Sequence, residues 1–311
     1  MSAPADRGRA EIAAAARRIA GRARRTPVIA AETPAGEVLL KLETLQATGA
    51  FKVRGALAAL TAAEVPEAGV VAASGGNHGA AVAFAARALG LRAEIFVPEI
   101  AAPAKVARIR AAGAEVVVGG AFYADAREAA AARRAETGAL DVPAFDHAEV
   151  IAGQGTLARE FEMQAEPFGG LDAVLVAVGG GGLIAGTLGW LAGAARVAGV
   201  ETPGCRALAA ALEAGAPAPV EVSGLAADSL GAPRLGALPF AMVAGRVEAV
   251  EVTDDDVRAA QAWAWDALRI PLEPGGAAAL AGLLSGRWIP RPGERVGVVL
   301  CGANLDARDL P

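Results

Sequence analysis

The sequence has 311 residues, of which 54% are hydrophobic and 20% are charged, and its formal net charge at pH 7 is −5. A chain of this length and composition can bury a large core and has room for two domains. Because charges of both signs are interspersed, nucleic acid and anionic membrane surfaces are poor partners, and small-molecule chemistry is favoured.

The first segment of the chain, residues 7–27, is rich in arginine and alanine and predicts an amphipathic helix. Its arginines are typical of a transit peptide, but Glu11 and the lack of a cleavage signal argue against one. No signal peptide stands out, and the two cysteines, Cys205 and Cys301, lie in apolar segments without the spacing of metal ligands. These features predict a protein of the reducing cytoplasm.

Short apolar runs alternate with alanine-rich helical patterns along the rest of the chain. Helices are predicted from Pro103 and after Thr253, where an acidic first turn suits the positive end of the helix. The chain therefore predicts an α/β fold of mostly parallel sheets flanked by helices. Strands covered on both faces are predicted at 69–74, 93–98, 114–119, 172–178 and 295–301.

Residues 173–195 contain no charge and are long enough to cross a membrane. Four consecutive glycines, Gly179, Gly180, Gly181 and Gly182, interrupt this segment, so a strand, a glycine turn and a helix explain it better than a membrane span. Bare N–H groups at the start of a helix can bind a phosphate. The spacing matches neither a P-loop nor the GxGxxG fingerprint, and a tight turn is the alternative.

Lys52 is one of only three lysines in the chain, with Lys41 and Lys105. It follows Phe51 in a segment of small and apolar residues. An amine in an apolar setting can lose its proton and attack a carbonyl, which an arginine cannot do. Lys52 is thus a candidate for chemistry, and the alternative is an ordinary lysine that extends to water.

A second loop lies at the carboxyl end of the strand predicted at 69–74, where open α/β sheets bind ligands. Its N–H groups could bind a carboxylate, and the Asn77 amide could bind a ring hydroxyl group. The candidate residues of this loop are Ser74, Gly75, Gly76, Asn77 and His78.

Cys301 ends the last predicted strand and occupies the same kind of position. A thiol nucleophile there would need a base, and the chain has only two histidines, His78 and His147. The alternative is a buried, unreactive thiol. Two histidines also disfavour a zinc cluster, and no metal site is predicted.

Five motifs, spread in order over most of the chain, occur together: "ETLQATGAFKVRGA", "SGGNHG", "VGGGGLIAGT", "LEPGGAAAL" and "LCGANLD". In combination they resemble the serine/threonine dehydratase (threonine ammonia-lyase) branch of the fold-type II, tryptophan synthase β-like, pyridoxal-phosphate enzymes. The resemblance implies that pyridoxal 5'-phosphate is the cofactor and that it forms a Schiff base with Lys52.

The resemblance also assigns the other site residues. It places Phe51 under the cofactor ring, Asn77 at the 3-hydroxyl group and Cys301 at the pyridine nitrogen. It assigns the phosphate to the loop of Gly179 through Gly182, and the substrate carboxylate to the loop of Ser74, Gly75, Gly76, Asn77 and His78.

The implied activity is β-elimination of a β-hydroxy L-amino acid, such as L-threonine or L-serine, to a 2-oxo acid and ammonia, with Lys52 removing the α-proton. One alternative is β-replacement of the cysteine synthase type, whose motifs usually read Ser-Val-Lys-Asp-Arg and Ser-Gly-Asn-Thr-Gly. A noncatalytic binding protein on the same fold is a second alternative, which the presence of both Lys52 and the glycine loop disfavours.

The resemblance implies two domains with the cofactor in the cleft between them. The large domain would comprise residues 1–43 and 146–311, and the small domain residues 44–145. Relatives are commonly dimers, so we expect a homodimer. Because the chain ends soon after Cys301, no regulatory domain with isoleucine feedback is expected.

Departures from the family pattern narrow the expectation. Racemases carry a serine where this chain has Gly75, so racemisation is disfavoured. Members that bind a divalent ion have a carboxylate six residues after a glutamate, whereas Glu213 is followed by Pro219, which leaves at most a monovalent ion at Glu213. Ala50 and Ser229 replace the usual serine and glycine and leave the identity of the substrate open.

Overall fold

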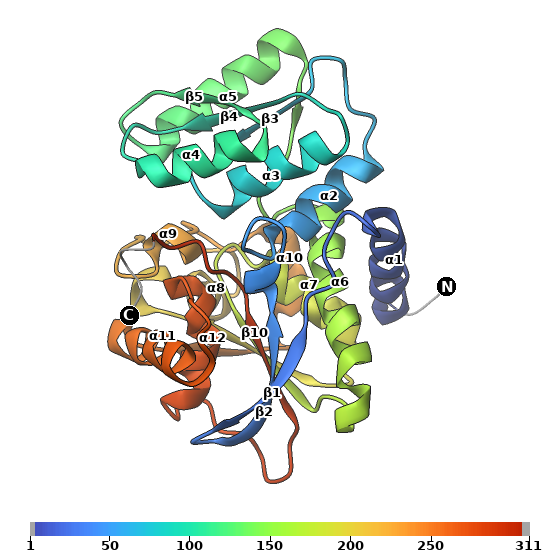
Figure 1. Cartoon of the computed structure of the whole chain (residues 1–311), viewed down its shortest axis with the longest axis vertical. Helices are drawn as coiled ribbons and strands as arrows, with labels where there is room; N and C mark the ends of the chain where they lie inside the picture. Colours follow the sequence, from blue (N-terminus) through green and yellow to red (C-terminus); the bar gives the residue numbers. More distant parts are fainter. Residues whose placement is uncertain (1–3, 307–311) are drawn as a thin grey trace.

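The computed structural model describes residues 4–306 and contains two sheets, each flanked by helices (Figure 1). The smaller sheet and helices α3, α4 and α5 form the upper part in Figure 1, and the larger sheet forms the lower part. The helices are α1 (Pro4–Ile19), α2 (Lys52–Ala62), α3 (Asn77–Ala88), α4 (Pro103–Ala112), α5 (Tyr123–Thr137), α6 (Ala148–Ala165), α7 (Gly182–Leu191), α8 (Ala207–Ala214), α9 (Ala227–Leu230), α10 (Ala237–Val243), α11 (Asp254–Leu268) and α12 (Pro274–Leu284).

The larger sheet has the strand order β1-β2-β10-β7-β8-β9. Strands β1 and β2 pair antiparallel, and the other neighbours pair parallel. This arrangement confirms the predicted α/β class with mostly parallel sheets. The strands are β1 (Val28–Thr33), β2 (Gly36–Leu42), β7 (Ala173–Ala177), β8 (Arg196–Glu201), β9 (Glu248–Glu251) and β10 (Val296–Leu300).

The smaller sheet has the order β5-β4-β3-β6, and its neighbouring strands all pair parallel. Strands β3 and β4 are buried, as predicted, but β5 is mostly exposed. The prediction that β5 is covered on both faces was therefore wrong, because β5 lies at the edge of its sheet. The strands are β3 (Val70–Ala73), β4 (Ala93–Val97), β5 (Glu115–Val118) and β6 (Leu140–Asp141).

The local predictions for helices agree closely with the structure. Helix α4 begins at Pro103, and Thr253 caps α11 by accepting a hydrogen bond from the Asp256 N–H group at 3.1 Å. The uncharged segment 173–195 forms strand β7 and helix α7. Within residues 4–306, no helix is both long and apolar enough to cross a bilayer.

The first helix is shorter than its sequence pattern predicts. It ends at Ile19, and Gly21 follows with a φ of +77°, a conformation that terminates helices. Ile12, Ala15 and Ile19 form its buried stripe. The antiparallel strand pair β1–β2 that follows was not predicted, because its first strand mixes buried and exposed residues without a clear alternation.

A buried ion cluster anchors helix α2, which begins at Lys52. The Arg54 guanidinium donates to the Glu43 carboxylate at 2.7 and 2.8 Å and to the Glu160 carboxylate at 3.2 Å. Lys41 on β2 also donates to Glu160, at 2.6 Å. Because these side chains come from β2, α2 and α6, the cluster holds the first turn of α2 against the larger sheet.

Candidate active site

A cavity of about 440 Å³ lies where the carboxyl ends of strands from both sheets meet. Every residue predicted to bind the cofactor or the substrate lines this cavity. The structure therefore brings together residues that are far apart in the chain. These residues are Phe51, Lys52, Ser74, Gly75, Gly76, Asn77, His78, Gly179, Gly180, Gly181, Gly182 and Cys301.

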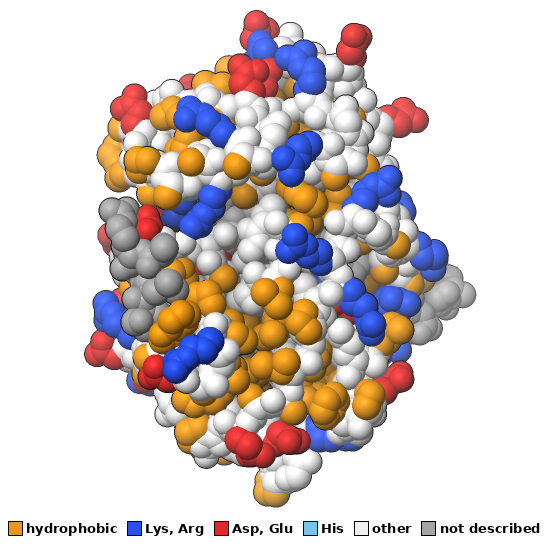
Figure 2. Space-filling view, in the orientation of Figure 1, with side chains coloured by type: hydrophobic (Ala, Val, Ile, Leu, Met, Phe, Trp, Pro, Cys, Tyr) orange, Lys and Arg blue, Asp and Glu red, His pale blue; other side chains and the backbone are white. Residues whose placement is uncertain are grey.

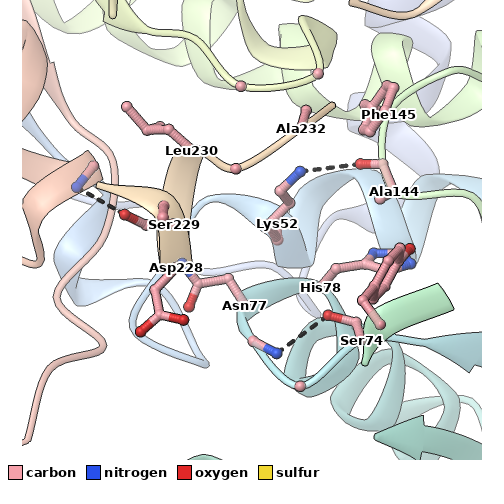
Figure 3. A pocket seen from close by; sticks show the side chains of 18 of the residues that line it. Lys52, Ser74, Asn77, His78, Ala144, Phe145, Asp228, Ser229, Leu230 and Ala232 are labelled. Atoms are coloured by element: carbon pink, nitrogen blue, oxygen red, sulfur yellow. Dashed lines mark hydrogen bonds between the residues drawn. The ribbon is translucent and has the colours of Figure 1, made fainter. Parts of the chain in front are cut away.

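Lys52 lines the cavity at the first position of α2 (Figure 3). The preceding segment is fastened to the end of β10, because the Phe51 N–H group donates to the Cys301 carbonyl at 3.1 Å and Ala50 bridges to Gly302. The Lys52 Nζ atom donates to the Ala144 carbonyl at 3.1 Å and lies 5.2 Å from the centre of the Phe51 ring. No described carboxylate forms an ion pair with it.

The electrostatic surroundings of Lys52 favour a neutral amine. Burial lowers the pKa of Lys52 to about 8, well below its ordinary value of 10.5. Burial and the neighbouring Lys52 also lower the pKa of His78 to about 4. Since His78 Nε2 lies 2.8 Å from the Val142 carbonyl, this neutral ring donates from Nε2. His78 is therefore held as a neutral side chain in the wall.

The glycine loop between β7 and α7 has no room for side chains. A Cβ atom on Gly180 would lie 2.2 Å from the Phe145 ring, and one on Gly181 would lie 2.6 Å from Leu235. Gly181 also has a φ of +91°. Within residues 4–306, the N–H groups of Gly179, Gly180 and Gly181 donate to no protein acceptor. A phosphate fits such a row of free N–H groups at a helix start.

Two side chains fix the orientation of the Asn77 amide. Its Nδ2 donates to the Glu273 carboxylate at 2.7 Å, and its Oδ1 accepts from Asn304 Nδ2 at 2.6 Å. The amide therefore has one N–H left for a ligand. Burial raises the pKa of Glu273 to about 7, although the hydrogen bond from Asn77 opposes this rise.

Cys301 is buried at the end of β10, and its Sγ donates to the Gly275 carbonyl at 3.4 Å. Burial raises the pKa of this thiol above its ordinary value. The thiol therefore stays protonated at neutral pH, which argues against the nucleophile considered from the sequence. A neutral thiol with a hydrogen-bonded proton agrees with the alternative of an unreactive group.

Sequence reasoning missed Phe145, which packs against the glycine loop. Ser229, noted in the sequence as a departure from the family pattern, lines the cavity, and its Oγ accepts from the Gly275 N–H group at 2.9 Å (Figure 3). Glu273 lies in the motif "LEPGG", which was used only for the family resemblance. Pro274, a residue typical of the first position of a helix, could have indicated that Glu273 lies at the start of a helix. Such a position can face a ligand site, and Glu273 does line the cavity.

Glu213 does not belong to the cavity. Its carboxylate is exposed at the end of α8 and accepts from the Arg206 guanidinium at 3.2 Å. An arginine in direct contact occupies the oxygens that a monovalent ion would need. The structure thus gives no support to an ion at Glu213.

Residues 19–302 match the family described as "Pyridoxal-phosphate dependent enzyme". A phenylserine dehydratase from Ralstonia pickettii is 39% identical over 280 residues, which cover 88% of this chain and 85% of that protein. An L-threonine ammonia-lyase from Thermotoga maritima is 35% identical over 284 residues, or 89% of this chain and 70% of that protein.

Solved structures agree with this relationship. A threonine deaminase from T.th. has a TM-score of 0.89 at 37% identity, over 96% of this chain and 98% of that one. Maize serine racemase has a TM-score of 0.90 at 30% identity, over 97% and 95% of the two chains. With this extent of similarity and a cavity that suits the cofactor, the chain belongs to the fold-type II family of pyridoxal-phosphate-dependent enzymes.

Proposed function

We propose that this enzyme is a lyase that converts a β-hydroxy L-amino acid into a 2-oxo acid and ammonia. Relatives named phenylserine dehydratase and L-threonine ammonia-lyase support this reaction class. The observation that carries the proposal is the Lys52 amine, which is unpaired with any described carboxylate and lines the same cavity as the free N–H groups of the glycine loop. An amine with a pKa of about 8 is partly neutral at physiological pH and can accept a proton.

Different residues of the cavity would bind different parts of the cofactor. Gly179 through Gly182 would hold the cofactor phosphate, Lys52 its reactive carbon, and Phe51 the face of its ring. The free N–H of Asn77 would bind the 3-hydroxyl oxygen, and the Cys301 thiol would face the pyridine nitrogen. When bound, pyridoxal 5'-phosphate supplies an electron sink for the electron pair left when the α-proton is removed.

The loop from Ser74 to His78 would bind the substrate carboxylate through its N–H groups. The Gly76 N–H group already donates to Ser74 Oγ at 3.2 Å, which holds the loop in a tight turn. With the carboxylate held there, the α-carbon would face the amine of Lys52, which lines the same cavity. A neutral thiol at Cys301 would not keep the pyridine nitrogen protonated as an aspartate would, so the cofactor would withdraw electrons less strongly, which favours prompt elimination over transamination.

Racemisation is a second candidate, because maize serine racemase shares the fold. It would need a second base on the face opposite Lys52, where racemases carry a serine. Gly75 has no side chain, and a Cβ atom there would lie 3.1 Å from Ala101 and 3.2 Å from Val97. The tight packing around Gly75 supports elimination rather than racemisation, and we expect no D-serine from L-serine.

The first experiment is 2-oxo acid release by the cofactor-loaded enzyme with L-threonine, L-serine and L-threo-β-phenylserine, with Lys52→Ala as the control. Release that disappears in the variant supports the proposal. Cysteine formed from O-acetyl-L-serine and sulfide, without 2-oxo acid from any hydroxy amino acid, would favour β-replacement. Retention of the cofactor with no turnover of any of these compounds would favour a binding protein.

The assignment of the phosphate to the glycine loop has its own test. Gly180→Ala would place a methyl group 2.2 Å from the Phe145 ring, so the loop must shift. Overpacking of this kind costs about 1–3 kcal/mol, which corresponds to roughly 5- to 150-fold weaker cofactor binding. Equilibrium titration of the apoenzyme with pyridoxal 5'-phosphate measures the change. Unchanged affinity would place the phosphate elsewhere.

We propose that the enzyme is a cytoplasmic homodimer of two-domain subunits. Figure 2 shows hydrophobic side chains gathered over the lower half of the visible face. Exposed apolar patches of this kind often mark surfaces through which subunits associate. All strands of the smaller sheet lie between residues 44 and 145, and all strands of the larger sheet lie outside this range, which supports the proposed domain boundaries. Both cysteines are free and buried, in keeping with a cytoplasmic protein. Sedimentation equilibrium would give the mass of the assembly.

A further inference from the structure

We infer that the enzyme prefers substrates whose β-carbon carries a large apolar group, best an aromatic ring, and that Ile100 and Tyr123 determine this preference. The inference rests on the proposed function and names the substrate class of the same cavity. The evidence for it is the composition of the part of the cavity wall to which no role in binding the cofactor is assigned.

That wall comes from the smaller sheet. It consists of the loop between β4 and α4 and the first residue of α5, and it contains Pro98, Ile100, Ala101, Ala102 and Tyr123. Apart from the tyrosine hydroxyl group, these side chains are entirely apolar. The rest of the lining includes the glycine loop, Lys52 and Cys301, which the cofactor would cover.

Two large side chains of this wall remain open to water. Ile100 is 75% exposed and Tyr123 is 52% exposed, although both line a concave site. Apolar surface in this position is stabilised when a ligand covers it, at about 25 cal/mol for each Å² removed from water. The β-carbon of serine carries only hydrogen besides its hydroxyl group, and that of threonine only a methyl group. Both offer far less apolar area to Ile100 and Tyr123 than a phenyl ring does.

The cavity must hold the cofactor as well as this group. Its volume of about 440 Å³ lies within the range of 300–1,000 Å³ that is typical of sites for drug-sized ligands. Small side chains at Ala101, Ala102, Ala144 and Ala232 leave the space between the walls free. An aromatic ring against Tyr123 could take an offset or edge-to-face arrangement, which is favourable beyond the area covered.

Charge excludes the competing class of acidic substrates. A second carboxylate, as in a hydroxyaspartate, would need a free cation in the wall. Besides Lys52, the lysine among the described lining residues is Lys105 on α4, which follows the loop of this wall, and its Nζ is already paired with Asp228 at 2.9 Å. Binding a β-carboxylate there would require this ion pair to break, whereas an apolar group leaves it intact.

The test compares kcat/KM of the cofactor-loaded enzyme for L-threo-β-phenylserine, L-threonine and L-serine. In each case the net reaction yields one 2-oxo acid and one ammonia, because the water lost in elimination is regained on hydrolysis. We expect phenylserine to exceed threonine at least about tenfold, the scale of discrimination that apolar pockets achieve. Ile100→Ala and Tyr123→Ala should each lower the phenylserine-to-threonine ratio at least about fivefold.

Phe122→Ala is the matched control. Phe122 is 67% exposed and precedes Tyr123, but it does not line the cavity. It should leave the ratio unchanged. Equal or better use of threonine by the parent enzyme, or a ratio that Phe122→Ala lowers as much as Tyr123→Ala does, would overturn the inference.

A binding measurement separates this inference from the proposed function. L-Phenylalanine and L-alanine lack the leaving group, so their dissociation constants can be read from the visible absorption of the bound cofactor without turnover. We expect phenylalanine to bind at least about tenfold more tightly than alanine, and Ile100→Ala to reduce this difference. If no hydroxy amino acid yields a 2-oxo acid, the proposed reaction fails, while this comparison still decides whether the wall recognises an aromatic group.

Discussion

The surroundings of Lys41 and Lys52 differ in one respect that decides their chemistry. Both amines lie inside the protein, and burial lowers the pKa of both. The Lys41 amine, however, donates to the Thr26 carbonyl, Glu160 and Gln164, at 2.6 to 2.7 Å. These bonds use all three of its N–H donors. Lys52 makes a single bond, to the Ala144 carbonyl, and faces an open cavity.

Burial alone therefore does not make a lysine reactive. In the ion cluster of Lys41, Arg54, Glu43 and Glu160, opposite charges offset much of the cost of removing each group from water. At Lys52 no described carboxylate forms an ion pair that offsets this cost, so the neutral, nucleophilic form gains population. The cluster helps to position Lys52, because Arg54 lies in the same turn of α2.

The largest expected effect comes from removing the reactive amine. Lys52→Ala should lower kcat for 2-oxo acid release by at least about 10³-fold, because the proton acceptor is lost. Lys41→Met should leave kcat per folded molecule within about tenfold, since the Lys41 amine does not reach the cavity. Comparable losses of kcat in the two variants would break the distinction between the two lysines.

Breaking the ion cluster should affect stability rather than chemistry. Arg54→Met would leave the Glu43 carboxylate buried without its cation, which costs about 3–5 kcal/mol. The urea concentration at half-unfolding measures this loss. Arg258→Met is the matched control, because Arg258 pairs with Asp255 at the surface and its loss should cost at most about 1 kcal/mol. Equal effects of the two variants would show that the cluster has no special place in the fold.

The smallest effect is a gain in stability when Lys52 is replaced. Its pKa is about 8 in the folded protein and 10.5 when exposed, so between these values the unfolded chain holds a proton that the folded chain lacks. The free energy of unfolding therefore rises with pH across this window. Below pH 8 the folded protein bears the full cost, and cofactor-free Lys52→Met should be more stable by about 1–3 kcal/mol at pH 7.

Denaturant unfolding of the two cofactor-free proteins at several pH values checks this expectation. The advantage of Lys52→Met should shrink between pH 8 and 10.5, because the native lysine becomes neutral in both states. A variant that is less stable than the parent at neutral pH would mean that the Lys52 side chain contributes packing that outweighs its desolvation.

Local patterns in the sequence were sufficient to predict several elements around the cavity. The apolar strands, the glycine loop and the start of α4 at Pro103 depend on neighbouring residues, so each could be predicted from a short segment. The exposure of β5 could not be predicted in this way. An edge strand and a central strand can have the same apolar composition, and only the order of strands distinguishes them.

The amino-acid sequence was sufficient to predict the fold class, the family, Lys52 as the candidate reactive amine and the two glycine-containing loops, because backbone conformation and amine chemistry require those residue types at those places. The surroundings of these residues depend on the tertiary structure. It brought Glu273 and Asn304 to Asn77, paired Lys105 with Asp228, and left Ile100 and Tyr123 uncovered in the cavity wall. These contacts join segments that are distant in the chain. A local sequence pattern does not determine which distant side chain will form such a contact.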